Sequence, residues 1–114
     1  MNIIQTSEGI RLNFYSSKDN SISKSYYLVK GNALKDSGIK DGDILVVDSS
    51  VELKQKEVVL AEKLGGYSIQ RFLEKKKKFL VPIDLDDEIL DLLVPMEVPN
   101  FTIVGVISII HEIV

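Results

Sequence analysis

The sequence predicts a domain of the all-β class. Short runs of aliphatic and aromatic residues recur along the 114 residues, and clusters of Gly, Asp, Asn and Ser separate them at short intervals. The composition, 45% hydrophobic and 27% charged, is typical of a globular chain with one ordinary domain. Strands separated so closely by turns favour a β-barrel or sandwich over a βαβ fold, with helix limited to short turns.

The charge and cysteine content argue against several classes of function. The net charge of −3 provides no global basic field, so the composition does not argue for direct nucleic-acid binding. No cysteine is present to form a disulfide framework or a thiolate metal site, which fits a cytoplasmic location. The N-terminus lacks the cationic and apolar regions of a signal peptide. The longest apolar tract, Ile103 to Ile110, is too short to span a bilayer.

The first 25 residues are expected to form an N-terminal arm and loop, followed by the main domain over residues 26–114. Within the arm, Ile3-Ile4 and Arg11 to Tyr15 are candidates for short strands. Ser16 to Ser25 is rich in Ser, Asn, Lys and Asp, and this composition predicts an exposed loop.

The middle of the chain, residues 27–48, is predicted to hold two strands joined by a polar connection of fixed shape. Tyr26 to Val29 and Ile44 to Val47 are the strands, because their aromatic and aliphatic side chains suit a pleated, half-buried surface. One helical turn is expected over residues 32–37. The residues that indicate tight reversals are Gly31, Gly38 and the Asp41-Gly42 pair.

The β pattern continues beyond Asp48. A polar loop is expected over residues 49–55, and Glu57 to Glu62 is the next predicted strand. The Gly65-Gly66 pair then indicates a hairpin to the strand from Tyr67 to Leu73. Side chains alternate between the two faces of such a strand.

The last third of the chain contains two more strands. Lys75 to Lys78 is a charged turn before the strand from Phe79 to Val81. The acidic segment from Asp84 to Asp91 is interleaved with Leu and Ile, and forms either a short amphipathic helix or an irregular strand. Phe101 to Val114 is the longest strand candidate. Both of its faces are apolar between Ile103 and Ile110, so both must be covered.

Seven residues of the central connection match a known pattern in order and spacing. They are Gly31, Asp36, Gly38, Ile39, Asp41, Gly42 and Asp43. This pattern resembles the self-cleaving Ser-Lys peptidase domain of LexA-type repressors and UmuD-type mutagenesis proteins, which is related to signal peptidase. The resemblance covers about residues 26–114, and the chain is closest in length to the processed UmuD-type form. It implies a LexA-like β-clip fold of coiled, highly curved antiparallel sheets.

Two positions depart from the pattern of that family. The resemblance aligns the serine nucleophile of the family with Ala33 and its catalytic lysine with Gln70. A Ser-Lys dyad needs a hydroxyl and a neutral amine, whereas alanine has no oxygen and glutamine cannot take up the proton. Arg71 fills the adjacent basic position, but it points to the opposite face of the strand. We therefore expect no peptidase activity and no cofactor.

Other residues were weighed as sources of catalysis. Ser37 and Ser68 are the nearest hydroxyls in sequence, but we expect a local turn contact for Ser37 and a packing role for Ser68, which has no evident base. Lone His111 has no acidic or histidine neighbour at ligand spacing, so we expect it at a surface or interface.

Two charged clusters also carry alternatives. Lys75 to Lys78 is expected to be a solvated hairpin tip, with phosphate contact as the alternative. The acidic cluster lacks the spacing and the glycine of a calcium-binding loop, so no metal is expected. Its members are Asp84, Asp86, Asp87 and Glu88.

The resemblance implies a homodimer in which the last strand pairs with its twin. The predicted interface consists of Phe101, Ile103, Val104, Val106, Ile107, Ile109 and Ile110. Without catalysis, we expect the function to be the binding of partner proteins. The resemblance suggests a Y-family polymerase, the RecA filament or an active family member.

Three hypotheses of function follow. The first is an inactive, dimeric protein-interaction module in the SOS response to DNA damage or in translesion polymerase regulation. The second is a phage or mobile-element regulator that forms mixed dimers with an active repressor. The third is a self-cleaving serine peptidase with a different catalytic site.

Overall fold

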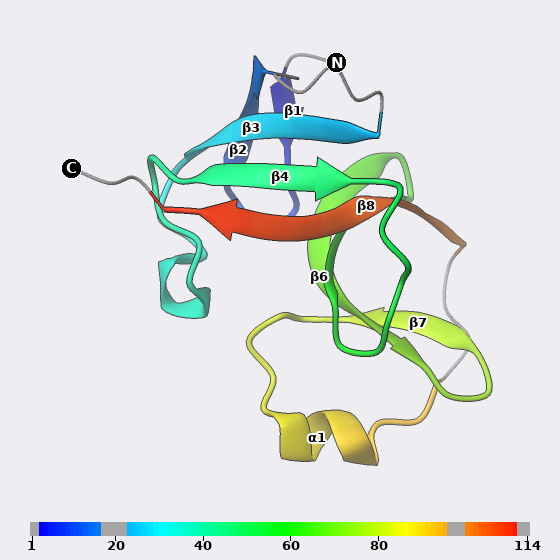
Figure 1. The fold of residues 1–114 in the computed structure, drawn as a ribbon. Helices are drawn as coiled ribbons and strands as arrows, with labels where there is room; N and C mark the ends of the chain where they lie inside the picture. The colour runs from blue at the N-terminus through cyan, green and yellow to red at the C-terminus, as the bar shows by residue number, and fades with distance from the viewer. Residues whose placement is uncertain (1–2, 17–22, 96–99, 112–114) are drawn as a thin grey trace.

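The computed structural model describes residues 3–16, 23–95 and 100–111. These residues form eight strands and two short helical segments (Figure 1). The strands are β1 Ile3–Gln5, β2 Arg11–Ser16, β3 Lys24–Lys30, β4 Ile44–Asp48, β5 Val58–Lys63, β6 Gly66–Glu74, β7 Lys78–Val81 and β8 Phe101–Ile110. The helical segments are the 3-10 turn η1 Lys35–Ser37 and the α-helix α1 Asp87–Leu92.

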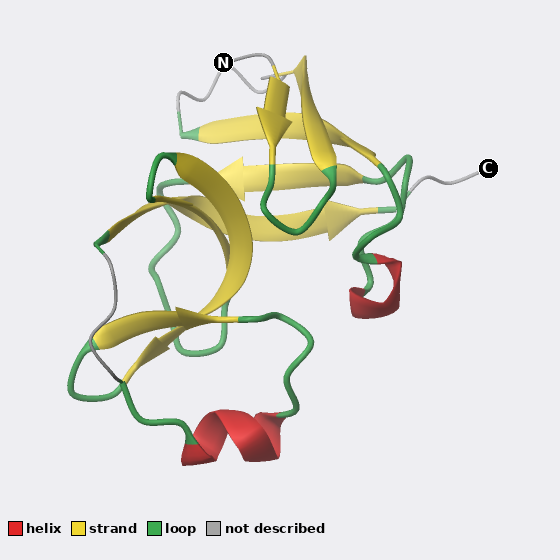
Figure 2. Ribbon diagram, turned by 180° about the vertical axis from the view of Figure 1, so that it is seen from behind, coloured by secondary structure: helices red, strands yellow, loops and turns green. Residues whose placement is uncertain are grey.

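All of these strands belong to one antiparallel sheet in the order β1-β2-β3-β4-β8-β5-β6-β7. The sheet is strongly curled, because the long strand β6 bends away from the layer of β3, β4 and β8 and leads down to β7 (Figures 1 and 2). The curl brings the N-terminal end of the sheet back onto β6, where Thr6 and Tyr67 form an isolated bridge. The predicted all-β fold of highly curved antiparallel sheet with short helical turns is confirmed.

Two apolar clusters hold this shape. The larger one fills the inside of the curl with side chains from β1 to β6 and β8, and its fully buried members include Leu12, Val29, Leu45, Leu60 and Ile69. In the smaller cluster, Leu73 of β6 and Phe79 and Val81 of β7 pack against Leu90 of α1. The apolar face of α1 thus covers the β6–β7 end of the sheet.

The connection between β3 and β4 is fixed by its own carboxylates. Gly31 N–H donates to Asp41 Oδ1 at 2.8 Å, and Lys40 N–H donates to Asp43 Oδ2 at 2.8 Å. Gly38 caps η1 with φ of +92°, in the left-handed region that favours glycine. Four of the residues that carry the family resemblance therefore shape the loop that leads to and from η1.

The loop predicted from Ser16 to Ser25 is shorter than expected. Ser16 ends β2, and Lys24 and Ser25 begin β3, where they pair with β4. Polar composition suggested a loop, but the ladder of backbone hydrogen bonds with β4 extends the strand through these residues. The rest of the predicted loop, residues 17–22, lies outside the described residues. The segment 1–25 also supplies two strands of the common sheet, β1 and β2.

The β5–β6 hairpin is confirmed, but its turn lies one residue earlier than predicted. Leu64 and Gly65 occupy the central positions with φ of 52° and 78°, and Gly66 already pairs with Lys63. Positive φ at both central residues is typical of a type I′ turn, which matches the twist of the flanking strands. Lys78 was likewise expected in a turn but begins β7, because it pairs with Glu74.

The acidic segment after β7 forms the helix α1, and this excludes the alternative of an irregular strand. The predicted C-terminal strand is present as β8, which ends at Ile110. Its expected continuation to Val114 includes residues 112–114, which lie outside the described residues.

Strand β8 lies inside the sheet, between β4 and β5. Its first half, 101–106, pairs with β5, and its second half, 106–110, pairs with β4. Gly105 lies near the junction of the two halves, where an added Cβ would be 2.8 Å from Val47 Cγ1 and 2.9 Å from the Asp48 carbonyl carbon. Among the described residues, each half of β8 therefore has one edge that pairs with no strand.

Candidate functional site

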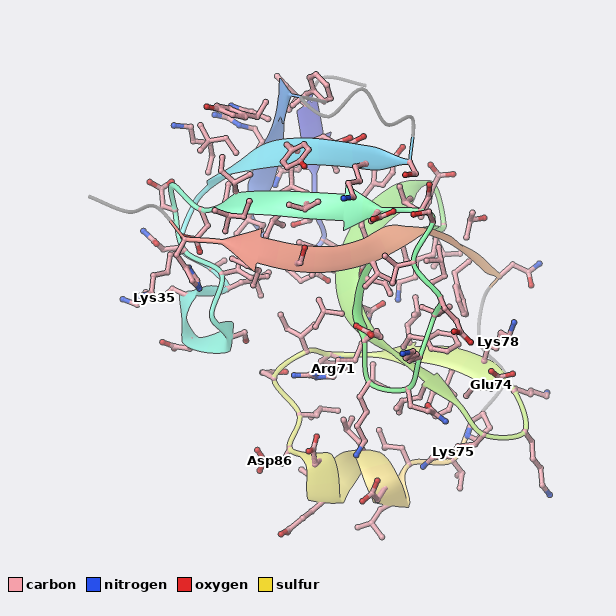
Figure 3. The ribbon with its side chains drawn as sticks, in the orientation of Figure 1. Lys35, Arg71, Glu74, Lys75, Lys78 and Asp86 are labelled. Atoms are coloured by element: carbon pink, nitrogen blue, oxygen red, sulfur yellow. The ribbon has the colours of Figure 1, made fainter. Side chains whose placement is uncertain are left out.

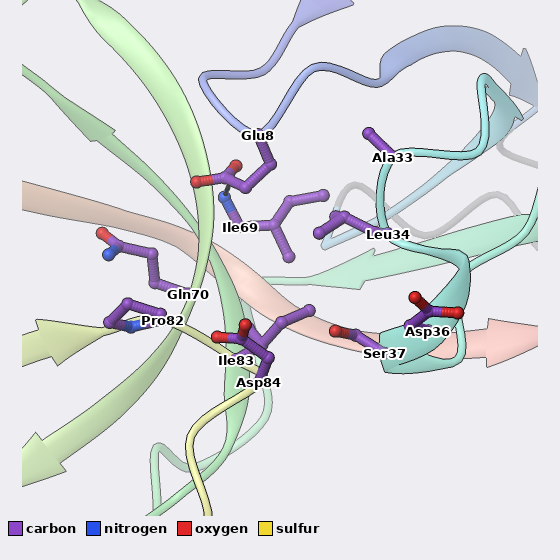
Figure 4. A pocket seen from close by; sticks show the side chains of 10 residues that line it. All are labelled: Glu8, Ala33, Leu34, Asp36, Ser37, Ile69, Gln70, Pro82, Ile83 and Asp84. Atoms are coloured by element: carbon purple, nitrogen blue, oxygen red, sulfur yellow. Dashed lines mark hydrogen bonds between the residues drawn. The ribbon is translucent and has the colours of Figure 1, made fainter.

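A groove of about 430 Å³ lies between the β3–β4 connection and the first half of β6 (Figure 4). Four segments that are distant in sequence line it. The lining residues are Glu8, Ala33, Leu34, Asp36, Ser37, Ile69, Gln70, Pro82, Ile83 and Asp84. The fold thus brings Ala33 and Gln70, the two positions singled out in the sequence, to the same groove.

Ala33 contributes an exposed methyl group to one wall. It lies just before η1, in the connection that Asp41 and Asp43 hold in shape. The neighbouring Leu34 packs against the larger apolar cluster and anchors this wall. Gly9 approaches from the β1–β2 turn, where an added Cβ would be 3.4 Å from the Ala33 Cβ.

Gln70 lies on β6, on the opposite wall. Its carboxamide points away from Ala33 in Figure 4, and its Oε1 is buried with no hydrogen-bond partner among the described residues. Arg71, the adjacent basic residue, does not line the groove. Its guanidinium donates to Lys56 O at 2.9 Å and to Ile83 O at 3.2 Å. Arg71 therefore ties together the segments before β5 and after β7 (Figure 3).

The structure adds a residue that the sequence interpretation missed. Glu8, in the turn between β1 and β2, reaches β6 and accepts hydrogen bonds from Ser68 Oγ and Ile69 N–H, each at 2.6 Å. We expected no base beside Ser68. This expectation is wrong, because the Glu8 carboxylate lies beside the Ser68 hydroxyl. Ser68 is only 2% exposed, so its hydroxyl faces Glu8 rather than solvent. The two residues are 60 positions apart, and no local pattern signals their contact.

The groove is acidic and contains no basic group among its described lining residues. Its ionisable side chains are the carboxylates of Glu8, Asp36 and Asp84, and Ser37 supplies its one hydroxyl. Ser37 lies in η1, where its backbone N–H donates to Leu34 O at 2.9 Å. The described lining residues therefore offer apolar walls and hydrogen-bond acceptors, but no amine.

His111 has an acidic neighbour that the sequence did not reveal. Its Nδ1 lies 3.1 Å from Asp43 Oδ1, although the two residues are far apart in the chain. The Asp43 side chain is 5% exposed and the His111 side chain 60% exposed, so the histidine lies on the surface, as predicted. The contact is an ion pair only when the imidazole is protonated.

The lysine cluster after β6 is partly structural. Lys75 Nζ donates to the carbonyl oxygens of Leu90, at 2.8 Å, Asp91, at 3.2 Å, and Leu93 at the C-terminal end of α1 (Figure 3). A cation near the last carbonyls of a helix stabilises the helix end. Lys78 is exposed, in keeping with the solvated hairpin tip expected there. The alternative of phosphate contact stays untested.

Two groups outside the groove have shifted pKa values. The Ser50 hydroxyl and N–H, at 2.7 Å and 2.8 Å, donate to Asp48 and hold the pKa of that carboxyl below its usual value. A hydrogen bond with Glu62 raises the pKa of Tyr67.

The residues expected at a dimer interface lie along β8 with graded exposure. Ile107 is buried, and Phe101, Ile103, Val104 and Val106 are half-buried. Ile109 and Ile110 are exposed, at 36% and 49%. The end of β8 thus presents apolar side chains to solvent, next to an edge without a strand partner in the described part of the chain.

Two further features of the described residues bear on function. No three of their His, Asp and Glu side chains converge in an arrangement that would bind a metal ion. No helix among them has the length and apolar character needed to cross a membrane.

Similarity to known proteins covers most of the chain. The family model described as Peptidase S24-like matches residues 4–108. Protein MucA of Salmonella typhimurium is 34% identical over 65 residues, which are 56% of this chain and 44% of MucA. The LexA repressor of a Marinomonas species is 32% identical over 81 residues, which are 70% of this chain and 39% of the repressor. Protein SamA of Salmonella typhimurium is 33% identical over 54 residues, 47% of this chain and 39% of SamA.

The aligned region spans less than half the length of each of these relatives. The family match, by contrast, runs from β1 almost to the end of β8 and includes all four segments of the groove. On that match, the chain belongs to the peptidase S24-like family, with LexA/UmuD-like proteins as its relatives.

Proposed function

We propose that this chain is a catalytically inactive LexA/UmuD-like domain that acts as a dimeric protein-interaction module in the DNA-damage response or in translesion polymerase regulation. The observation that carries the proposal is that Ala33 and Gln70 line one groove, although the family resemblance expects a serine and a lysine there. No amine among the described lining residues can serve as the base of a Ser-Lys dyad, and Ala33 has no oxygen to serve as its nucleophile.

The energetics of the two substitutions support this proposal. Members of a catalytic pair act as a unit, so the loss of either one removes most of the rate enhancement. A buried ammonium is costly to desolvate, whereas a neutral carboxamide is much less so. With Gln70 at this position, the fold does not bury the lysine ammonium group that only catalysis would require.

The edge of β8 supports a role in association. On the β5 side the pairing ends at Val59 with Val106, so residues 107–110 pair with no described strand on that edge. An exposed strand edge next to apolar side chains favours pairing with another chain. Antiparallel pairing of two copies of β8 would bury Ile109 and Ile110 and give a two-fold symmetric dimer.

A second candidate function follows from the same edge. The last strand of an active family member would pair with the edge of β8 as well as a second copy of this chain does. The chain would then form mixed dimers with a repressor. In either case the partners expected from the resemblance are a Y-family polymerase, the RecA filament or an active LexA/UmuD-like protein in the cytoplasm. The acidic groove and the net charge of −3 favour a protein partner over nucleic acid.

Intact-mass spectrometry tests the absence of peptidase activity. The chain is mixed with a LexA-type protein whose own nucleophilic serine has been replaced. The mixture is incubated at alkaline pH, once without and once with activated RecA. We expect both masses to stay unchanged, while an active LexA-type repressor serves as the positive control. Any fragment that appears only in the presence of this chain contradicts the proposed inactivity.

Size-exclusion chromatography with light scattering at micromolar concentration tests the dimer. We expect a mass of twice 12.8 kDa for the unmodified chain and a monomer for Ile109→Glu. Leu92→Glu is the matched control, because Leu92 is equally hydrophobic and 81% exposed but lies in α1, which does not pair with β8. A monomeric mass for the unmodified chain would contradict the proposed dimer.

A further inference from the structure

The turn between β1 and β2 occupies an edge of β6 that none of the described strands covers. Strand β7 pairs only with residues 71–74 of β6. Beside the preceding residues lies the turn instead: Ser7 N–H donates to Tyr67 O at 2.8 Å, and Thr6 forms a bridge with Tyr67. This turn also forms one end of the groove, because Glu8 lies between β6 and Ala33 (Figure 4).

The carboxylate of Glu8 takes the position that a carbonyl of a neighbouring strand would take. Its Oε1 accepts the Ile69 N–H and its Oε2 accepts the Ser68 hydroxyl, each at 2.6 Å. Ser7 Oγ adds a third, exposed donor to Oε2 at 3.1 Å. Distances this short are typical of hydrogen bonds to a charged carboxylate.

The two donors on β6 require an acceptor. Ser68 is 2% exposed and Ile69 is completely buried, so neither donor is freely solvated in the folded chain. Leaving a buried donor without a partner is strongly unfavourable, and Glu8 satisfies both at once. No cationic side chain lines the groove among the described residues, so the binding depends on hydrogen bonding rather than on charge pairing.

We propose that Ser68 Oγ–H and Ile69 N–H form a carboxylate-binding site, which Glu8 fills in cis and which accepts an extended peptide bearing a glutamate when Glu8 is absent. The turn over residues 6–9 then acts as a tethered occupant that closes this end of the groove. A tether of a few residues gives a local concentration in the millimolar range, so a free peptide competes poorly with it. The site does not involve β8, so this inference and the proposed dimer can fail independently.

A peptide-binding experiment tests the site. The probe is a fluorescent peptide with the sequence of residues 3–12 of this chain, and the matched probe carries Gln in place of its single Glu. Binding of both is measured to the unmodified protein and to Glu8→Ala. We expect the unmodified protein to bind neither probe measurably. Glu8→Ala is expected to bind the Glu probe at least tenfold more tightly than the Gln probe.

The Ile69 amide provides a second readout that does not depend on the peptide. In the unmodified protein this amide should exchange slowly with solvent. Exchange should be at least tenfold faster in Glu8→Ala, and the Glu probe should restore the slow exchange in that variant.

Several outcomes would overturn the inference. One is an Ile69 amide that behaves identically with and without the Glu8 carboxylate. Another is that Glu8→Ala binds the two probes equally well, or that the Glu probe binds the unmodified protein as tightly as it binds Glu8→Ala. A folded Glu8→Ala protein that binds neither probe also overturns it, because the vacated donors would then accept no carboxylate in trans.

Discussion

One wall of the groove is held by contacts within ten residues of sequence, whereas the opposite wall depends on a contact across 60 residues. Gly31 and Asp41 fix the loop that carries Ala33, and this loop joins two strands that pair with each other. Glu8 reaches Ser68 only after the sheet has curled from β1 round to β6. The first wall can therefore form early in folding, and the second is completed only with the whole fold.

This difference predicts different consequences of damage to the two walls. The loop is part of the β3–β4 unit, so breaking it should destabilise the protein as a whole. The Glu8 contact joins the β1–β2 turn to β6 after both have folded. Breaking it should therefore open the groove while the sheet stays intact. The following variants test that distinction, from the largest expected effect to the smallest.

Asp43→Ala is expected to lower the free energy of unfolding by about 2 kcal/mol. The Asp43 side chain is 5% exposed, and its Oδ2 accepts the Lys40 N–H at 2.8 Å, so truncation removes a charged acceptor and leaves the amide without it. Urea unfolding followed by circular dichroism measures the change. Asp43→Asn keeps an oxygen acceptor and should lose less than half as much. A loss below about 0.5 kcal/mol for Asp43→Ala would contradict a structural role for this carboxylate.

Glu8→Ala is expected to lower the free energy of unfolding by about 1 kcal/mol. Glu8 is half-buried, so water can replace part of what its carboxylate provides to Ser68 and Ile69. The same urea titration measures the loss, and the slope of the transition should stay unchanged because the sheet stays folded. Glu52→Ala, in the exposed loop after β4, is the control and should be neutral. A loss for Glu8→Ala as large as that for Asp43→Ala would remove the contrast between the walls.

The same contrast explains which parts of the site could be predicted from the sequence. Glycines and aspartates at fixed spacing identified the loop of Ala33, because turn chemistry is local and each residue type has a conformational reason for its position. Gln70 was found through a strand pattern and a family resemblance. Nothing around Glu8 distinguishes it from any exposed glutamate, and its partner Ser68 was taken to have no base.

The errors in the fold have a similar origin. Lys24 and Ser25 read as loop, because their composition is polar, and only their pairing with β4 makes them strand. His111 was described without an acidic neighbour, because Asp43 reaches it through the β4–β8 pairing rather than through sequence. In each case a tertiary contact overrides local preference, and a single sequence carries no record of that contact.

Asp48 extends the comparison to a local carboxylate outside the groove. Ser50 lowers its folded-state pKa below the usual value of 3.8, so the folded state favours the charged form. This contribution to stability is fully present above the unfolded-state pKa, and it is lost as the pH falls through the folded-state pKa. Ser50→Ala should therefore lower the thermal midpoint at pH 7, and the difference from the unmodified protein should shrink toward pH 2. A difference that stays constant with pH would contradict this assignment.

The smallest expected effect is at the turn that leads into β6, where a substitution should raise the free energy of unfolding instead of lowering it. Leu64 is 81% exposed and adopts φ of 52°, a region that leucine populates rarely but asparagine tolerates. Leu64→Asn creates the Asn-Gly pair preferred in type I′ hairpins, so it should raise the free energy of unfolding by about 0.5 kcal/mol. Leu64→Val, which is β-branched, should lower it by a similar amount. Because Leu64 does not line the groove, Leu64→Asn should leave the Ile69 amide exchange of the folded state unchanged. Faster exchange in this variant would mean that the far wall depends on the hairpin as much as on Glu8.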